Sequence, residues 1–206
     1  MKKLLLLIFL MLPGASSMVS AQDLRTIFRD APDEIFPLLT KNLRADLVDY
    51  VDAGMTAKVT NKLDGVSVLE KLEDDYLLLA TTASSTMQLK LLPMQDCTII
   101  CVVKTVKAEA ADSRIYFYDL EWNRLDGCEM FRLPAIKDFF IPGSDVDEVA
   151  DICDIYLVAL ALNAVDSTLV AEYTMPAYMA ADDAEKVKPL MRKLVYRWNG
   201  ERFVIE

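Results

Sequence analysis

The chain has 206 residues, of which 32 are acidic and 22 are basic, for a net charge of −10. It contains no histidine, which excludes Ser-His-Asp and Cys-His catalysis and histidine metal sites. The acidic balance argues against nucleic acid and anionic membranes as partners, because both bind basic patches. The few, scattered glycines exclude a Gly-rich phosphate loop or a dinucleotide fingerprint.

The first 21 residues have the features of a cleavable signal peptide. Lys2 and Lys3 precede an apolar run over residues 4–12, and Val19-Ser20-Ala21 is a small-residue cleavage site. We therefore predict a signal peptide over residues 1–21 and a periplasmic or extracellular protein. The apolar run is too short to span a bilayer, which takes about 20 residues. No later run is long enough and no cysteine follows the cleavage site, so we expect neither a transmembrane segment nor a lipid anchor.

Residues 22–206 are predicted to form a single α+β domain, which begins with a helical part over about residues 30–54. Asp30 is placed to cap a short turn. The next segment has an amphipathic pattern, with Arg44 among its polar positions and four apolar residues on one face: Leu43, Leu47, Tyr50 and Val51. Gly54 is a typical helix stop.

From about residue 57 the pattern changes to that of β-strands. The stretches "MQLKLLP" and "SRIYFYDLEW" alternate, whereas "CTIICVVKTV" is a continuous apolar run typical of a strand covered on both faces. Short links between successive strands indicate antiparallel pairing. We expect a mostly antiparallel, curved β-sheet in meander order. Cystatin-like and other antiparallel α+β architectures both remain open.

Further elements are predicted in the C-terminal half. One or two short helices interrupt the strands, the first beginning at Ser144 and the second near Asp182, where Asp182 and Glu185 are spaced as a capping box. Asn199-Gly200, between two alternating apolar runs, indicates a terminal hairpin. Val195, Phe203 and Ile205 are its candidate core residues.

An acidic cluster over residues 145–154 raises the question of calcium. A calcium-binding loop that starts at Asp145 would need an oxygen ligand at Val149, glycine at Ala150 and glutamate at Tyr156, and it has none of them. An acidic first turn of a helix explains the cluster better. We therefore expect no metal site and no cofactor. The acidic residues concerned are Asp145, Asp147, Glu148, Asp151 and Asp154.

Four residues are candidates for a binding surface. Arg114, Tyr116, Tyr118 and Trp122 could form an exposed platform for a sugar or a peptide, since arginine and aromatic residues are enriched at binding surfaces. Ordinary cross-strand packing is the alternative, and the pattern favours it.

The four cysteines lack a CxxC spacing, so neither a thioredoxin-like nor a zinc-knuckle site is indicated. In an extended strand, Cys97 and Cys101 lie about 13 Å apart. A disulfide tolerates about 7 Å at most, so these two should not be bonded to each other. Bridges to Cys128 or Cys153 and four free thiols both remain open.

Several stretches together resemble a family of secreted proteins of unknown function in Bacteroidales. They are "QDLRTIFRDAPDEIFPLLTKNLRADLVDY", "LEDDYLLLATTASSTMQLKLLP", "DSRIYFYDLEWNRL" and "YRWNGERF". The resemblance covers almost all of the chain after the signal peptide. It implies an exported protein of a Gram-negative envelope, and it implies no activity and no functional residues.

Two functions from different classes fit the sequence. The first is a non-enzymatic periplasmic or secreted module that binds an envelope protein, a peptide or a glycan. The second is a histidine-free, glycosidase-like hydrolase that uses two carboxylates, although no pair stands out among the 32 acidic residues. We favour the first, because nothing in the sequence marks a catalytic pair.

Export with cleavage after Ala21 can be tested by mass. The mature chain should begin at Gln22 and keep 185 residues with a net charge of about −12, because Lys2 and Lys3 are removed. Intact-mass measurement of the exported protein checks this. A mature chain that still carries Met1 would contradict the signal peptide.

Overall fold

The computed structural model describes residues 23–144, 153 and 155–206. Two helices come first, α1 (Leu24–Asp30) and α2 (Lys41–Asp52). A six-stranded antiparallel sheet follows in simple chain order, made of β1 (Lys58–Thr60), β2 (Val66–Leu72), β3 (Tyr76–Thr82), β4 (Ser85–Pro93), β5 (Thr98–Lys107) and β6 (Ala111–Tyr118).

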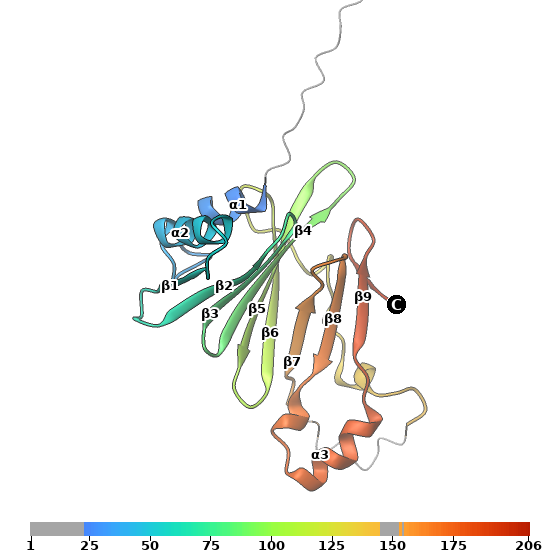
Figure 1. The fold of residues 1–206 in the computed structure, drawn as a ribbon. Coiled ribbons are helices and arrows are strands. Elements are labelled where there is room, and N and C mark those ends of the chain that lie inside the picture. Colours follow the sequence, from blue (N-terminus) through green and yellow to red (C-terminus); the bar gives the residue numbers. More distant parts are fainter. Residues whose placement is uncertain (1–22, 145–152, 154) are drawn as a thin grey trace, which may run out of the picture.

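The second half forms a four-stranded antiparallel sheet in the order β10-β9-β8-β7. Its strands are β7 (Val158–Leu162), β8 (Thr168–Tyr173), β9 (Leu194–Trp198) and β10 (Phe203–Ile205). Short helical segments connect the strands: η1 (Ile136–Phe139), η3 (Met175–Ala177), α3 (Ala181–Val187) and η4 (Lys188–Leu190). Figure 1 shows the small sheet beside β6, with α3 at its lower end.

The predicted α+β class and the antiparallel order are confirmed, with the strands divided between two sheets. Two local predictions are wrong. The helical part begins at Leu24, capped by Asp23, and not near residue 30, where α1 already ends. The helix α3 begins after Ala180 without a side-chain cap, so Asp182 and Glu185 form no capping box.

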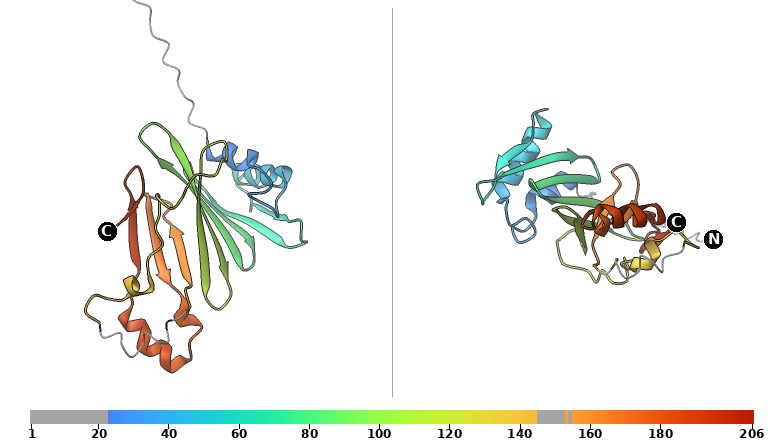
Figure 2. Two further views of the ribbon diagram at one scale, coloured as in Figure 1. Left: turned by 180° about the vertical axis from the view of Figure 1, so that it is seen from behind. Right: turned by 90° about the horizontal axis from the view of Figure 1, so that it is seen from below.

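The six-stranded sheet is covered on both faces, and β5 shows this most clearly. Ile99, Cys101 and Val103 belong to the core shared with the small sheet, whereas Ile100 and Val102 belong to the core shared with α1 and α2. The two views in Figure 2 show the helices and the small sheet on opposite sides. The continuous apolar run of β5 therefore has the predicted cause, which is a strand buried on both faces.

Polar side chains of the large sheet join it to the small one. The N–H groups of Val158, Leu160 and Leu162, on the free edge of β7, donate to three side-chain oxygens. The acceptors are Asp112 Oδ1 at 3.4 Å, Ser113 Oγ at 3.0 Å and Gln88 Oε1 at 2.9 Å. Buried N–H groups need such partners, so these side chains hold the edge of β7 against the face of the large sheet.

Lys90 is a second polar link between the sheets. Its side chain is only 1% exposed, and its Nζ atom lies 2.9 Å from Asp75 Oδ2 and donates to Ala164 O at 3.0 Å. The alternation in "MQLKLLP" suggested that Gln88 and Lys90 lie opposite the apolar positions of β4. They do, but the small sheet covers that face as well, so both are buried.

Arg44 holds the loop between α1 and α2. The sequence placed it on the polar face of α2, but the structure buries it almost completely. Its guanidinium donates to the carbonyls of Phe28 and Leu39, at 3.1 and 2.6 Å, and to that of Ala31. It also pairs with Asp33 at 2.9 Å. The loop bends around this one cation, which satisfies main-chain carbonyls that have no helical partner.

The predicted terminal hairpin is confirmed, since β9 and β10 pair across a turn in which Gly200 has a φ of +99°. Asn199 Oδ1 accepts hydrogen bonds from the N–H groups of residues 201 and 202. Phe203 is buried, whereas Ile205 is half exposed and Val195 only partly buried. The core side chains of β9 are instead Leu194, Tyr196 and Trp198.

Two predictions concern segments outside the described residues. The signal peptide over residues 1–21 is one of them. The other is the acidic helix predicted to begin at Ser144, whose cluster at Asp145, Asp147, Glu148, Asp151 and Asp154 lies within the undescribed residues 145–152 and 154.

Replacing Arg44 should destabilise the protein strongly. Arg44→Met keeps an apolar stem but leaves three buried carbonyls without their donor, and each such group costs about 1–3 kcal/mol. We expect the free energy of unfolding to fall by about 3 kcal/mol or more. The control is Lys41→Met, because Lys41 pairs with Asp30 in solvent and exposed pairs contribute about 0–1 kcal/mol. Urea unfolding decides, and equal midpoints for the two variants would contradict the role of Arg44.

Replacing Gln88 tests the contact between the two sheets. Gln88→Leu removes the acceptor of the Leu162 N–H and the partner of the Tyr76 hydroxyl, which lies 3.3 Å away. We expect a loss of about 1–3 kcal/mol, the cost of a buried polar group without a partner. The control Asn123→Ala removes an exposed hydrogen bond to Asp119 and should cost less. Chemical denaturation of both variants makes the comparison.

Candidate functional site

The candidate residues on β6 face the helix-bearing side of the sheet. Tyr118 is buried in the core with α1 and α2, and Tyr116 packs at the margin of that core. Arg114 is exposed and lies on the same face by the two-residue period of a strand. Ile115 and Phe117 point to the opposite face, toward the small sheet.

Tyr118 and Trp122 contribute to the core around α1. Their rings lie 5.5 Å apart, and Trp122 also meets Phe36 edge-on at 6.0 Å. The indole N–H of Trp122 donates to Ile27 O at 3.3 Å, and the residue has a φ of +66° in the turn after β6. Their apolar faces are therefore occupied by protein atoms.

Arg114 and Tyr116 instead belong to an accessible cationic surface, which we call the Tyr116 patch: Lys104, Arg114, Tyr116 and Arg124. Arg124 lies over the Tyr116 ring, with its Cζ atom 4.9 Å from the ring centroid, and Lys104 Nζ lies 5.8 Å from the same centroid. Lys104 and Arg114 are direct partners in the register of β5 and β6. Like charges directly opposite each other destabilise a sheet.

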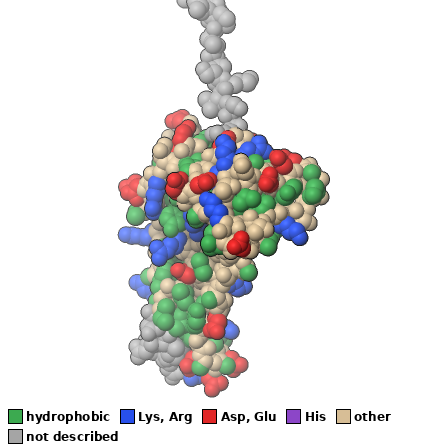
Figure 3. Space-filling view, turned by 90° about the vertical axis from the view of Figure 1, so that its left-hand side faces the viewer, with side chains coloured by type: hydrophobic (Ala, Val, Ile, Leu, Met, Phe, Trp, Pro, Cys, Tyr) green, Lys and Arg blue, Asp and Glu red, His purple; other side chains and the backbone are tan. Residues whose placement is uncertain are grey.

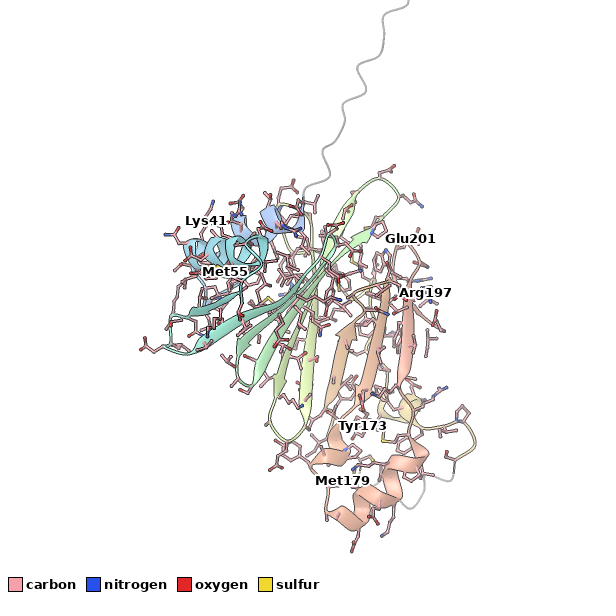
Figure 4. All side chains as sticks on the ribbon, viewed as in Figure 1. Lys41, Met55, Tyr173, Met179, Arg197 and Glu201 are labelled. Carbon is pink, nitrogen blue, oxygen red and sulfur yellow. The ribbon has the colours of Figure 1, made fainter. Side chains whose placement is uncertain are left out.

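The described part of the chain supplies no ion-pair partner for this patch. Within the described residues, Lys104, Arg114 and Arg124 form no ion pair, whereas many other cations do. Lys41, for example, lies 2.7 Å from Asp30, and Arg197 lies 2.5 Å from Glu206, at distant places on the molecule (Figure 4). Around α1 and α2, acidic and basic side chains are interspersed (Figure 3). The patch is distinguished by the clustering of its cations: Lys104 and Arg124 lie over one ring, and Arg114 lies opposite Lys104 on the same face.

An apolar pocket of about 180 Å³ adjoins the patch at Lys104. Phe36, Leu38 and Met87 contribute apolar walls, and Lys104 lies at its margin. The Nζ atom of Lys104 donates to Ile35 O at 3.1 Å, and burial lowers the pKa of this lysine from its ordinary value. The site therefore offers positive charge next to a small apolar recess.

The described carboxyl groups give no support to carboxylate-based hydrolysis. Those with clearly displaced pKa values are Asp30, Asp33 and Asp166, and all three are displaced downward. The causes are hydrogen bonds from Lys41, Arg44 and Thr168 respectively. A general acid needs a raised pKa, so none of these three can donate a proton at neutral pH.

Cys101 is also unsuited to nucleophilic catalysis. Cys97, Cys101 and Cys128 are free thiols, and the expectation that Cys97 and Cys101 are not bonded to each other is confirmed. Cys101 is fully buried, and burial raises the pKa of its thiol. A thiol kept protonated in this way is a poor nucleophile.

Sequence reasoning found half of the patch and missed Lys104 and Arg124. Lys104 lies within the apolar run of β5, and its register opposite Arg114 could have been read only by aligning β5 with β6. Arg124 returns to β6 through an isolated bridge with Tyr118 after a sharp turn. The amino-acid composition of this segment does not predict that Arg124 lies beside β6.

Two features are absent from the described residues. These residues contain no group of three or more cysteine, aspartate or glutamate side chains arranged to hold a metal ion. No helix among them has the length and apolar character needed to cross a membrane.

The architecture is that of an α+β protein with two antiparallel sheets and a cationic surface on one of them. The chain belongs to the family described as Protein of unknown function (DUF3256), which matches residues 16–203. It is similar to the structure of a domain of an uncharacterized protein from Porphyromonas gingivalis W83, with 27% sequence identity and a TM-score of 0.79. The match covers 89% of this chain and 98% of that chain. A comparison with curated proteins gave no match.

Proposed function

We propose that this protein is an exported, non-enzymatic binding module that takes an acidic segment of a protein or peptide on the Tyr116 patch. The observation that carries the proposal is the cluster of Lys104 and Arg124 over the Tyr116 ring with Arg114 opposite Lys104, for which the described residues supply no carboxylate partner. Two of these cations are directly opposed across β5 and β6, an arrangement that costs stability. An anionic ligand would remove that cost, so the patch is better suited to a bound state than to the free protein.

The signal-peptide features of residues 1–21 support export. An exported protein would meet its partner outside the cytoplasm. A protein that carries about −12 charges repels most acidic partners at long range. Binding therefore needs local contacts at the patch, and we expect it to weaken as salt screens them.

A peptide or protein fits the patch better than a glycan does. Sugars stack on free aromatic faces, but Arg124 and Lys104 lie over the ring of Tyr116. Tyr118 is buried, and Trp122 donates to a main-chain carbonyl. The carboxylate of an acidic side chain can pair with these cations through charge-assisted hydrogen bonds.

Charge reversal tests the proposal. In fluorescence anisotropy with labelled peptides that mix glutamate and valine, we expect Arg114→Glu combined with Arg124→Glu to weaken binding by about tenfold or more. The matched control is Lys58→Glu, an exposed cation on β1 at the opposite edge of the same sheet, which should bind as the parent does. Equal affinities for both variants, or no binding of acidic peptides by the parent protein, would refute the proposal.

A further inference from the structure

Between its two ends, the edge of β6 has main-chain groups that no described main-chain group pairs with. Phe117 O accepts from Leu125 N at 2.9 Å near the upper end, and Ala111 O accepts from Thr174 Oγ1 at 2.5 Å near the lower end. Both acceptors point away from β5. Main-chain groups alternate direction along a strand, so those of Ser113 and Ile115 point outward as well.

The register supports this direction. Lys107 N donates to Ser84 O, away from β6, so Lys107 and its partner Ala111 form a pair without mutual hydrogen bonds. The pairing continues without a bulge, which gives Ser113 and Ile115 the same orientation as Ala111. Among the described residues, no main-chain group pairs with the outward N–H and C=O groups of Ser113 and Ile115.

A groove of about 410 Å³ lies along this edge. Arg114 and Tyr116 line it on the helix-bearing side, and Ile115, Leu133 and Tyr156 add apolar surface. The Leu133 side chain is 51% exposed. The Tyr156 hydroxyl donates to Pro134 O at 2.9 Å, which fixes its ring in the groove. Charge and apolar surface thus flank one row of main-chain groups that have no main-chain partner among the described residues.

We infer that the Tyr116 patch binds its ligand as an added β-strand on β6, and that the ligand is an extended segment in which acidic residues alternate with apolar ones. This inference rests on the proposed function and specifies its geometry. Residues directly opposite each other in a sheet share a face. A ligand residue opposite Arg114 or Tyr116 therefore points to the cations, and one opposite Ile115 points to Leu133.

Strand addition suits the site because the main chain and the side chains of the ligand would make separate contacts. Main-chain hydrogen bonds to Ser113 and Ile115 hold the backbone, and the alternating side chains give the specificity. A ligand with its acidic and apolar residues in blocks can satisfy the cations but cannot place both kinds of side chain correctly. Sequence pattern, and not charge alone, should then decide affinity.

A synthetic peptide of about eight residues with alternating glutamate and valine is the probe. We expect it to bind at least about tenfold more tightly than a peptide of the same composition in blocks. N-methylation of every second residue separates main-chain from side-chain contacts, since a strand turns alternate N–H groups to opposite edges. One N-methylated set should abolish binding and the other should leave it nearly unchanged.

Variants of the protein give an independent measurement. Leu133→Ser should weaken binding of the alternating peptide several-fold, whereas Leu63→Ser, at an exposed leucine in the β1–β2 turn, should not. Circular dichroism confirms that each variant is folded before it is compared.

The outcomes distinguish this inference from the proposed function. Binding that requires Arg114 and Arg124 but is equally sensitive to both N-methylated sets overturns strand addition and leaves the proposed function in place. Peptide binding that does not depend on Arg114 and Arg124 overturns both strand addition and the proposed function. A concentration-dependent dimer abolished by Arg114→Glu would assign the edge to a second copy of the chain and overturn the peptide ligand.

Discussion

The free edge of β7 is the constraint on which the joining of the two sheets depends. Three of its N–H groups are turned toward the face of the large sheet, where they would be costly without acceptors. Asp112, Ser113 and Gln88 supply those acceptors from two strands that are far apart in sequence from β7. The polar residues inside this interface thus set the position of the small sheet, and the apolar side chains around them provide most of the buried area.

A second chain of contacts connects the helices with the candidate site. Arg44 holds the carbonyls of Phe28, Ala31 and Leu39, which fixes the loop between α1 and α2. Ile35, in that loop, accepts a hydrogen bond from Lys104. The buried arginine therefore positions one of the cations of the Tyr116 patch without touching it. The helical part does more than cover the sheet, because its loop also forms a wall of the apolar recess.

The fold class could be predicted from the sequence because its signals are local. The alternation of β4 and β6, the continuous apolar run of β5 and the Asn199-Gly200 turn each describe one element and its nearest neighbours. Long-range burial was not predictable in this way. Lys90 and Gln88 occur in an alternating strand typical of a solvent-facing side, and only the small sheet, formed about 70 residues later, buries them. Arg44 was misplaced for the same reason, since the carbonyls that it binds belong to an irregular loop.

The candidate site was half predicted, because Arg114 and Tyr116 share a strand, whereas Lys104 and Arg124 join them only through register and a sharp turn.

The four sheet edges differ in a way that singles out β6. The edge strand β1 is three residues long, and the exposed continuation of β2 carries a register shift between Leu69 and Lys71. The β7 edge is capped by side chains, and at the β10 edge Phe203 N donates to Met130 O. Short edges, bulges and capped groups are the means by which proteins prevent unwanted strand pairing. Along Ser113 and Ile115 the described chain supplies no such main-chain partner, but places a charge opposite a like charge. The cations beside this edge attract an acidic strand, so β6 is the edge at which selective pairing with a partner can occur.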